Sequence, residues 1–265
     1  MNSEELKEYA KFASDLAKES GTIMLEYFDS EKNKIEIKKD NSPVTIADKK
    51  INDLVIQRIR DAYPDHGIIG EEKSLNSGKE AYVWSCDPID GTLPYSHGIP
   101  MSMFSLALVD CTVGQPILGI IYDPFFDRLY IAQKGQGAYL NDEQVSVNGQ
   151  SILHGGLIAV DGKKLFDAFA LASDLRQRDI HVIKLASVVY AGSFLPKGSS
   201  LGVIFANQTA YDVAALKVII EEAGGKTSNL SGNEQRYDED INGFVGSNGY
   251  VHDALLDIIS AERAK

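Results

Sequence analysis

The chain has 265 residues, of which 44% are hydrophobic and 24% are charged, and its formal net charge is −12. This is an ordinary globular composition, with enough chain for one large domain or two lobes. The acidic balance excludes a protein that binds nucleic acid through its phosphate backbone, because that function needs basic residues. Two cysteines cannot build a disulfide framework, and no apolar run reaches membrane-spanning length. A cytoplasmic protein with reduced thiols and no membrane contact is the simplest expectation.

Two amphipathic helices are predicted near the N-terminus. Apolar residues recur at helical spacing over about residues 3–28 and again over about residues 45–63. Thr45 and Asp48 fit a capping box at the start of the second helix, and this structural role accounts for both residues. The polar segment 31–43 between the helices is expected to form a strand or a loop.

Short apolar runs then predict strands. The runs GIIGEE and YVWSCD are expected to be buried strands that end in acids, and the runs MFSLALV, ILGIIY and RLYIAQ to be antiparallel strands. After about residue 149, strands alternate with helices, which favours an α/β arrangement. We therefore expect an α+β lobe over residues 1–150 with a mixed antiparallel sheet, followed by a smaller α/β lobe over residues 151–265.

The stretch DPIDGT places two carboxylates close together in the chain. Proline pushes Asp87 into an extended conformation, so Asp87 is expected to end a strand, with Asp90 in the following turn. Carboxylates that converge repel each other unless a cation lies between them, and oxygen ligands favour Mg²⁺, Mn²⁺ or Ca²⁺. Gly91 allows a tight turn that leaves Thr92 with free amides for a phosphate. In isolation, however, such a turn more often binds nothing.

Further acids support the metal interpretation. Glu71 and Glu72 follow a short buried strand, where adjacent acids are costly without a partner. Asp212 lies in the first turn of an apolar helix, where it could be either a helix cap or a ligand.

Four segments occur in an order and at a spacing that resemble the inositol monophosphatase family of magnesium-dependent, lithium-sensitive phosphatases: SPVTIAD, IIGEE, WSCDPIDGT and YDVAALKVIIEEAGG. The resemblance covers nearly the whole chain. It implies a layered αβαβα sandwich, a homodimer, and a phosphomonoesterase that acts on a small phosphorylated metabolite. Bisphosphate nucleotidases and histidinol-phosphatases are similar and remain alternatives. The non-enzymatic alternatives are a metal-binding regulatory protein with vestigial activity and a structural calcium site.

The resemblance also implies site residues. Two or three Mg²⁺ ions, or Mn²⁺ in their place, would be bound by the side chains of Glu71, Asp87, Asp90 and Asp212 and by the backbone carbonyl of Ile89. Glu71 and Thr92 would orient the attacking water, with Asp40 as a further candidate for its activation. The amides of Gly91 and Thr92 would hold the phosphate.

The part of the pocket that would contact the rest of the substrate departs from the family pattern. A Gly-Ser pair of the family falls on Ala186 and Ser187, and the residue that would contact sugar hydroxyls is a phenylalanine, Phe205. An aromatic wall would leave polyol hydroxyls unpaired, so inositol 1-phosphate is not expected to be the best substrate. Lys38 is predicted either to contact phosphate or a metal-bridging water, or to be an ordinary surface lysine.

Overall fold

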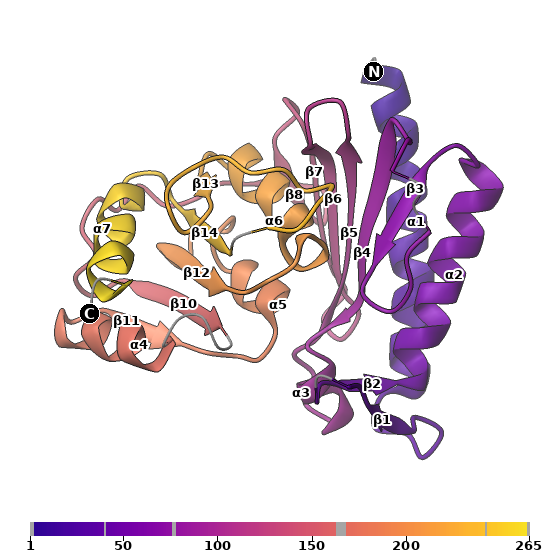
Figure 1. The fold of residues 1–265 in the computed structure, drawn as a ribbon, viewed down its shortest axis with the longest axis horizontal. Helices are drawn as coiled ribbons and strands as arrows, with labels where there is room; N and C mark the ends of the chain where they lie inside the picture. Colours follow the sequence, from indigo (N-terminus) through magenta and orange to yellow (C-terminus); the bar gives the residue numbers. More distant parts are fainter. Residues whose placement is uncertain (1–2, 40, 76–77, 163–167, 242, 264–265) are drawn as a thin grey trace.

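The structure is a computed structural model. It describes residues 3–39, 41–75, 78–162, 168–241 and 243–263. Five layers follow one another in the order αβαβα, as Figure 1 shows from right to left. The expected layered sandwich is confirmed.

The first layer consists of α1 (Ser3–Tyr27) and α2 (Ile46–Ala62), which lie side by side on one face of the large sheet. Their apolar stripes pack against this sheet, as the helical spacing predicts. The polar segment between them forms an antiparallel pair of short strands, β1 (Ile35–Ile37) and β2 (Pro43–Thr45).

The large sheet has seven strands whose spatial order follows the sequence: β3 (Gly67–Gly70), β4 (Tyr82–Asp90), β5 (Met103–Asp110), β6 (Gln115–Asp123), β7 (Arg128–Gln133), β8 (Ala138–Leu140) and β9 (Glu143–Val145). Only β3 and β4 are parallel; the other neighbours are antiparallel. The prediction that the strand β4 ends at Asp87 is wrong. It continues to Asp90, because a shift in register between these two aspartates keeps the chain paired with β5.

The middle layer is made of α5 (Val188–Gly192) and α6 (Ala210–Glu222), which lie between the two sheets. α6 is buried on nearly all sides, as its apolar sequence requires. Gly119 of β6 allows it to approach closely, because a Cβ atom at this position would lie 2.6 Å from the carbonyl oxygen of Ala215.

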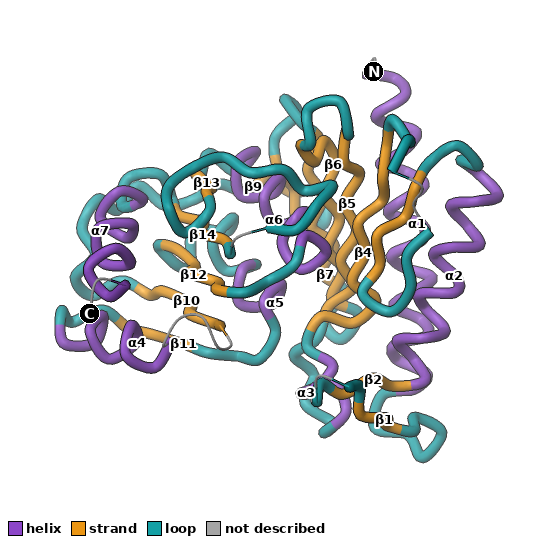
Figure 2. The backbone as a smooth tube through the Cα atoms, viewed as in Figure 1, coloured by secondary structure: helices purple, strands orange, loops and turns teal. Residues whose placement is uncertain are grey.

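The second sheet has five strands in the spatial order β11 (His181–Ile183), β10 (Leu157–Gly162), β12 (Gly202–Ala206), β14 (Phe244–Ser247) and β13 (Lys226–Ser228). The first three are mutually parallel, so their carboxyl ends meet at one edge of the sheet. Figure 2 shows that the loops which follow β11 and β12 turn toward the large sheet.

The outer layer consists of α4 (Ala168–Gln177) and α7 (His252–Arg263). The division into lobes at about residue 150 stays a prediction. Within the described parts of the chain, no helix is long and apolar enough to cross a membrane.

Candidate active site

A cavity of about 410 Å³ lies where the end of β4, the start of α6 and the carboxyl ends of the parallel strands meet. It is lined by Asn41, Ser42, Pro43, Glu71, Asp87, Asp90, Gly91, Thr92, Leu93, Asp161, Lys184, Ala186, Val188, Gln208 and Asp212. The four acids that the sequence selected as metal ligands therefore share one cavity, although they come from three separate segments of the chain.

The two aspartates of the DPID stretch are buried and held in place by backbone amides. Asp87 Oδ1 accepts a hydrogen bond from the amide of Ile89 at 3.0 Å. Asp90 accepts hydrogen bonds from the amides of Val188 (3.0 Å) and Val189 (2.9 Å) at the start of α5. Because α5 belongs to the middle layer, these bonds tie the edge of the large sheet to the C-terminal half of the chain.

Asp212 both caps α6 and lines the cavity. The amide and hydroxyl of Thr209 donate to its Oδ2 atom at 2.7 and 2.9 Å, as in a capping box. Oδ1 takes part in neither bond. The cap and the ligand interpretations of Asp212 are therefore compatible, since each needs only one carboxylate oxygen.

Asp48 repeats this arrangement at the start of α2. Its Oδ2 atom accepts hydrogen bonds from the amide (2.8 Å) and hydroxyl (2.5 Å) of Thr45, which confirms the predicted capping box. Its Oδ1 atom lies 3.1 Å from Oγ1 of Thr92, a cavity residue. Reading Asp48 as a cap alone therefore missed a site residue. The signal was its other carboxylate oxygen, which a capping box does not use.

Glu71 and Glu72 follow β3 and share one cation. Nζ of Lys38 lies 2.8 Å from Oε1 of Glu71 and 2.5 Å from Oε1 of Glu72. These two hydrogen bonds raise the pKa of Lys38 despite its partial burial. Lys38 is thus a paired residue of the site rather than an ordinary surface lysine, and its contact with phosphate stays a prediction. Carboxylate oxygens of Asp48, Glu71 and Glu72 all lie within 4.8 Å of one another.

Burial raises the pKa values of the aspartates in this site, and the charges of neighbouring acids add to this effect for Asp48, Asp87 and Asp212. Burial raises the pKa of Asp90 to about 6 and the pKa values of Asp48 and Asp212 to about 7. Burial, followed by the charges of Glu71, Asp90 and Asp212, raises the pKa of Asp87 well above its usual range. Such a cluster is costly unless a cation neutralises it. All of the donors are oxygen atoms, so the residues fit a hard divalent cation such as Mg²⁺.

Two backbone conformations shape the cavity. Gly91 has φ +84°, and a Cβ atom there would lie 2.8 Å from Cβ of Ser187, so glycine is required. Ala186 has φ +54°, in the left-handed region that favours glycine. This conformation fits the predicted placement of the family's Gly-Ser pair on Ala186 and Ser187.

Two residues predicted to contact substrate do not line the cavity, and those predictions are wrong. Ser187 is buried behind Asp90, to which its hydroxyl donates a hydrogen bond, and it caps α5. Phe205 is fully buried in β12 and stacks on Phe244, with ring centroids 6.4 Å apart. The prediction for Phe205 came from an alignment to the family pattern without gaps. In the structure, the side chain of Phe205 points from β12 into the core between the two sheets.

Two further predictions remain open. Asp40 lies outside the described residues. The carbonyl of Ile89 accepts a hydrogen bond from Thr92 Oγ1 at 3.1 Å. Because a carbonyl oxygen has two lone pairs, a bond from Ile89 to a metal stays a prediction.

Three further residues that line the cavity come from the C-terminal half of the chain, and the sequence analysis did not select them. Asp161 lies in β10, Lys184 directly follows β11, and Gln208 follows β12 by two residues. They meet in the cavity because the three strands are parallel neighbours, and ligands often bind at the carboxyl ends of such strands. Their position at predicted strand ends was the available signal.

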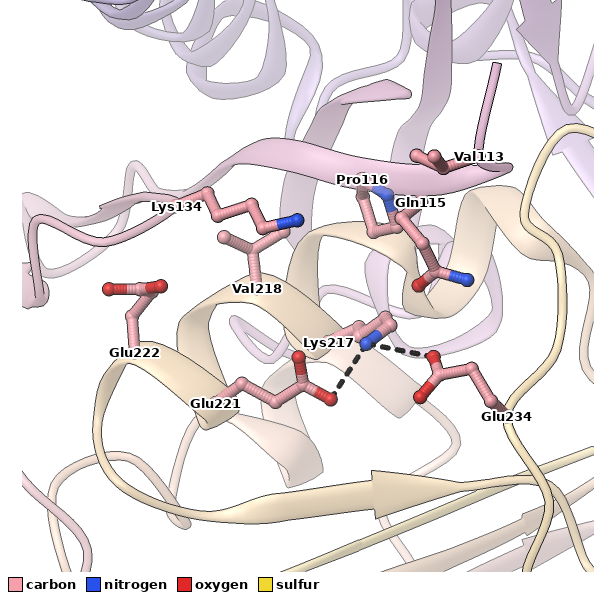
Figure 3. A pocket seen from close by; sticks show the side chains of 9 residues that line it. All are labelled: Val113, Gln115, Pro116, Lys134, Lys217, Val218, Glu221, Glu222 and Glu234. Carbon is pink, nitrogen blue, oxygen red and sulfur yellow. Dashed lines mark hydrogen bonds and ion pairs between the residues drawn. The ribbon is translucent and has the colours of Figure 1, made fainter. Parts of the chain in front are cut away.

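A second cavity, of about 490 Å³, lies beside the C-terminal half of α6 (Figure 3). Lys217 and the three glutamates that line this cavity all have partners in the chain. Nζ of the buried Lys217 lies 2.7 Å from Glu221 and 3.1 Å from Glu234, and Glu222 accepts hydrogen bonds from the amides of Gly135 and Gly137. Lys217 thus pairs with two of the three glutamates, whereas the hydrogen bonds described above for Asp87, Asp90 and Asp212 come from uncharged amides and a hydroxyl group.

Comparisons with known proteins identify the family of this chain. The sequence model of the inositol monophosphatase family matches residues 5–263. Inositol monophosphatase 1 of Solanum lycopersicum is 30% identical over 96% of this chain and 95% of its own length. The fructose-1,6-bisphosphatase/inositol-1-monophosphatase of Aquifex aeolicus is 29% identical over 96% of each chain. The solved structure of a Thermotoga maritima IMPase is 25% identical and superposes with a TM-score of 0.87, covering 96% of this chain and 97% of the other.

Proposed function

The chain belongs to the inositol monophosphatase family and is a phosphomonoesterase of that type, and we propose that it acts with Mg²⁺ held by Glu71, Asp87, Asp90 and Asp212. The observation that supports this proposal is the cavity in which these four acids meet: Glu71 pairs with Lys38, and the described partners of the other three acids are uncharged donors. A regulatory protein without activity would have no use for such a costly cluster.

The carboxylates would coordinate the metal, and hydrogen bonds from neighbouring groups fix the positions of two of them. When bound, Mg²⁺ would supply the positive charge that neutralises phosphate oxygens and lowers the pKa of a water. Asp90 is fixed by the amides of Val188 and Val189, and Asp212 by its own helix cap. Asp90 and Asp212 are therefore held in position before substrate enters.

Thr92 and Asp48 form a route for the proton of the attacking water. The hydroxyl of Thr92 lies within 3.1 Å of both Asp48 Oδ1 and the carbonyl of Ile89. If it donates to Asp48, its lone pairs are free to accept a proton from water in the cavity, while its own proton moves to the carboxylate. Glu71, which lines the same cavity, would orient that water, and the amides of Gly91 and Thr92 would bind the phosphate.

Asp90→Asn tests the proposal. This variant keeps the size of the side chain and an acceptor for the amides of α5, but it loses the charge that binds the metal. We expect Mg²⁺-dependent hydrolysis of glycerol 2-phosphate to be abolished while the far-ultraviolet circular dichroism stays unchanged. Activity close to that of the original protein would refute the assignment. The exposed Asp257→Asn, far along the chain on α7, is the control for loss of one charge.

Three finer properties are part of the proposal: the resemblance to the family implies the first two, and the third is the expectation from the sequence. We propose inhibition by millimolar lithium, a homodimer, and a cytoplasmic location. The first two are measured by inhibition of phosphate release and by sedimentation. Insensitivity to lithium would contradict only the lithium statement, since the cavity acids do not depend on it.

A further inference from the structure

Lys184 brings a cation into an otherwise acidic cavity. Among the described residues that line this cavity, the charged ones are Lys184 and five acids, which are Glu71, Asp87, Asp90, Asp161 and Asp212. Four of these acids are the proposed metal ligands, and the metal already supplies positive charge for the phosphate that is hydrolysed. The charge of Lys184 is additional to what that phosphate needs.

Asp161 holds Lys184 at the wall of the cavity. Oδ1 of Asp161 accepts a hydrogen bond from the amide of Gly162 at 2.7 Å and lies 3.3 Å from Nζ of Lys184. The side chain of Asp161 is only 16% exposed, whereas that of Lys184 is 58% exposed. Asp161 is therefore the anchored partner and Lys184 the accessible one. An ammonium group has three N–H donors, and the contact with Asp161 occupies one of them, which leaves two for a ligand.

We propose that Lys184 binds a second anionic group, a phosphate or a carboxylate, on the part of the substrate that is not hydrolysed. This inference rests on the proposed function. The nearby carboxylate of Asp161 offsets much of the long-range charge of Lys184, so an uncharged polyol gains little from the pair. An anion that takes up the two remaining donors makes charge-assisted hydrogen bonds, which are about twice as strong as neutral ones. Gln208 and Asn41 offer neutral polar groups for the rest of the molecule.

The test compares two substrates in the same protein with Mg²⁺. Fructose 1,6-bisphosphate carries a second anionic group, and glycerol 2-phosphate does not. We expect Lys184→Ala to lower the ratio of their kcat/KM values about tenfold or more, mainly through a higher KM for the bisphosphate. Lys184→Arg, which keeps the charge, should change the ratio much less. Lys226→Ala is the matched control, because Lys226 is 52% exposed and also pairs with an aspartate, Asp253. It should leave the ratio unchanged.

The outcomes separate this inference from the proposed function. If the original protein hydrolyses both substrates and the ratio is the same in Lys184→Ala, the role of Lys184 is refuted and the phosphatase assignment stands. If the original protein hydrolyses neither substrate with Mg²⁺, the proposed function fails, and this inference fails with it. An equal loss on both substrates would also refute the inference, because it would assign Lys184 to the phosphate that is hydrolysed.

Discussion

The hydroxyl of Thr92 lies 3.1 Å from Oδ1 of Asp48, and this contact joins the start of α3 (Thr92–Ser96) to the start of α2. The two residues are 44 positions apart in the chain. Both are buried, so the contact is shielded from competing water.

Thr92→Ala is expected to lower kcat about a hundredfold or more, because the water loses its proton acceptor, while KM changes less. Thr92→Ser, which keeps a hydroxyl group, should retain most activity. The control is Thr112→Ala, since Thr112 also bonds an aspartate, Asp110, but lies in an exposed turn. Steady-state kinetics check these values. A variant with unchanged kcat and a higher KM would limit Thr92 to phosphate binding.

Asp87→Asn is expected to stabilise the metal-free protein while it destroys activity. Burial and neighbouring acids raise the pKa of Asp87 well above its usual range, so the folded state is penalised when this carboxylate is charged. The amide removes that penalty. In EDTA, calorimetry should show a Tm higher by a few degrees, whereas Asp257→Asn should show no change. Added Mg²⁺ should raise the Tm of the original protein much more than that of Asp87→Asn. Equal protection by Mg²⁺ would count against Asp87 as a ligand.

Gly119→Ala is expected to weaken metal binding from a distance. The new Cβ atom would lie 2.6 Å from the backbone of α6 at Ala215, so this helix must move, and it carries Asp212. We expect the Mg²⁺ concentration for half-maximal activity to rise, with a loss of stability of about 1–3 kcal/mol. Gly149→Ala is the control, because nothing lies within 4 Å of its Cβ position. Unchanged Mg²⁺ dependence with lowered stability would show that the position of α6 does not limit metal binding.

His252 is expected to make stability depend on pH. It is buried on α7, where its ring nitrogens each lie 2.9 Å from the hydroxyl of Ser228 or Ser247. Burial, followed by the charge of Lys226, lowers its pKa to about 4. Between about pH 4 and 6.5 the unfolded chain therefore binds more protons than the folded one, so the free energy of unfolding falls as the pH falls.

The expected loss between pH 7 and pH 5 is about 2 kcal/mol relative to His252→Gln, which cannot take up the proton. Urea unfolding in EDTA at both pH values measures it. The exposed His154→Gln should behave like the original protein. Parallel pH profiles for the original protein and His252→Gln would remove His252 as the cause.

The long elements were predictable from their apolar residues. α1 and α2 bury one face at helical spacing, whereas α6 and the central strands are nearly continuous apolar runs that are buried on all sides. The five-residue helix α5 and the three-residue strands β8, β9 and β13 were not predicted, since so few residues establish no period.

The acids of the site were predictable because DPID and its companion segments are specific in combination. The part of the cavity lined by Asp161, Lys184 and Gln208 was not predictable, because it depends on which strands of the second sheet pair with one another. Phe205 faces the core and Lys184 enters the cavity only because β11, β10 and β12 are parallel neighbours, and a single sequence does not state which strands pair.

The cavity draws its two walls from different parts of the chain. Thr92 and three of the proposed ligands lie at or just after the ends of strands of the large sheet, whereas Asp161, Lys184 and Gln208 lie at or just after the ends of strands of the small one. Mutations at the ends of the small sheet can therefore alter which molecule enters without disturbing the proposed metal ligands on the large sheet. Descendants of one ancestral enzyme could in this way have acquired new metabolites by changing a few loop residues, while the reaction itself stayed the same.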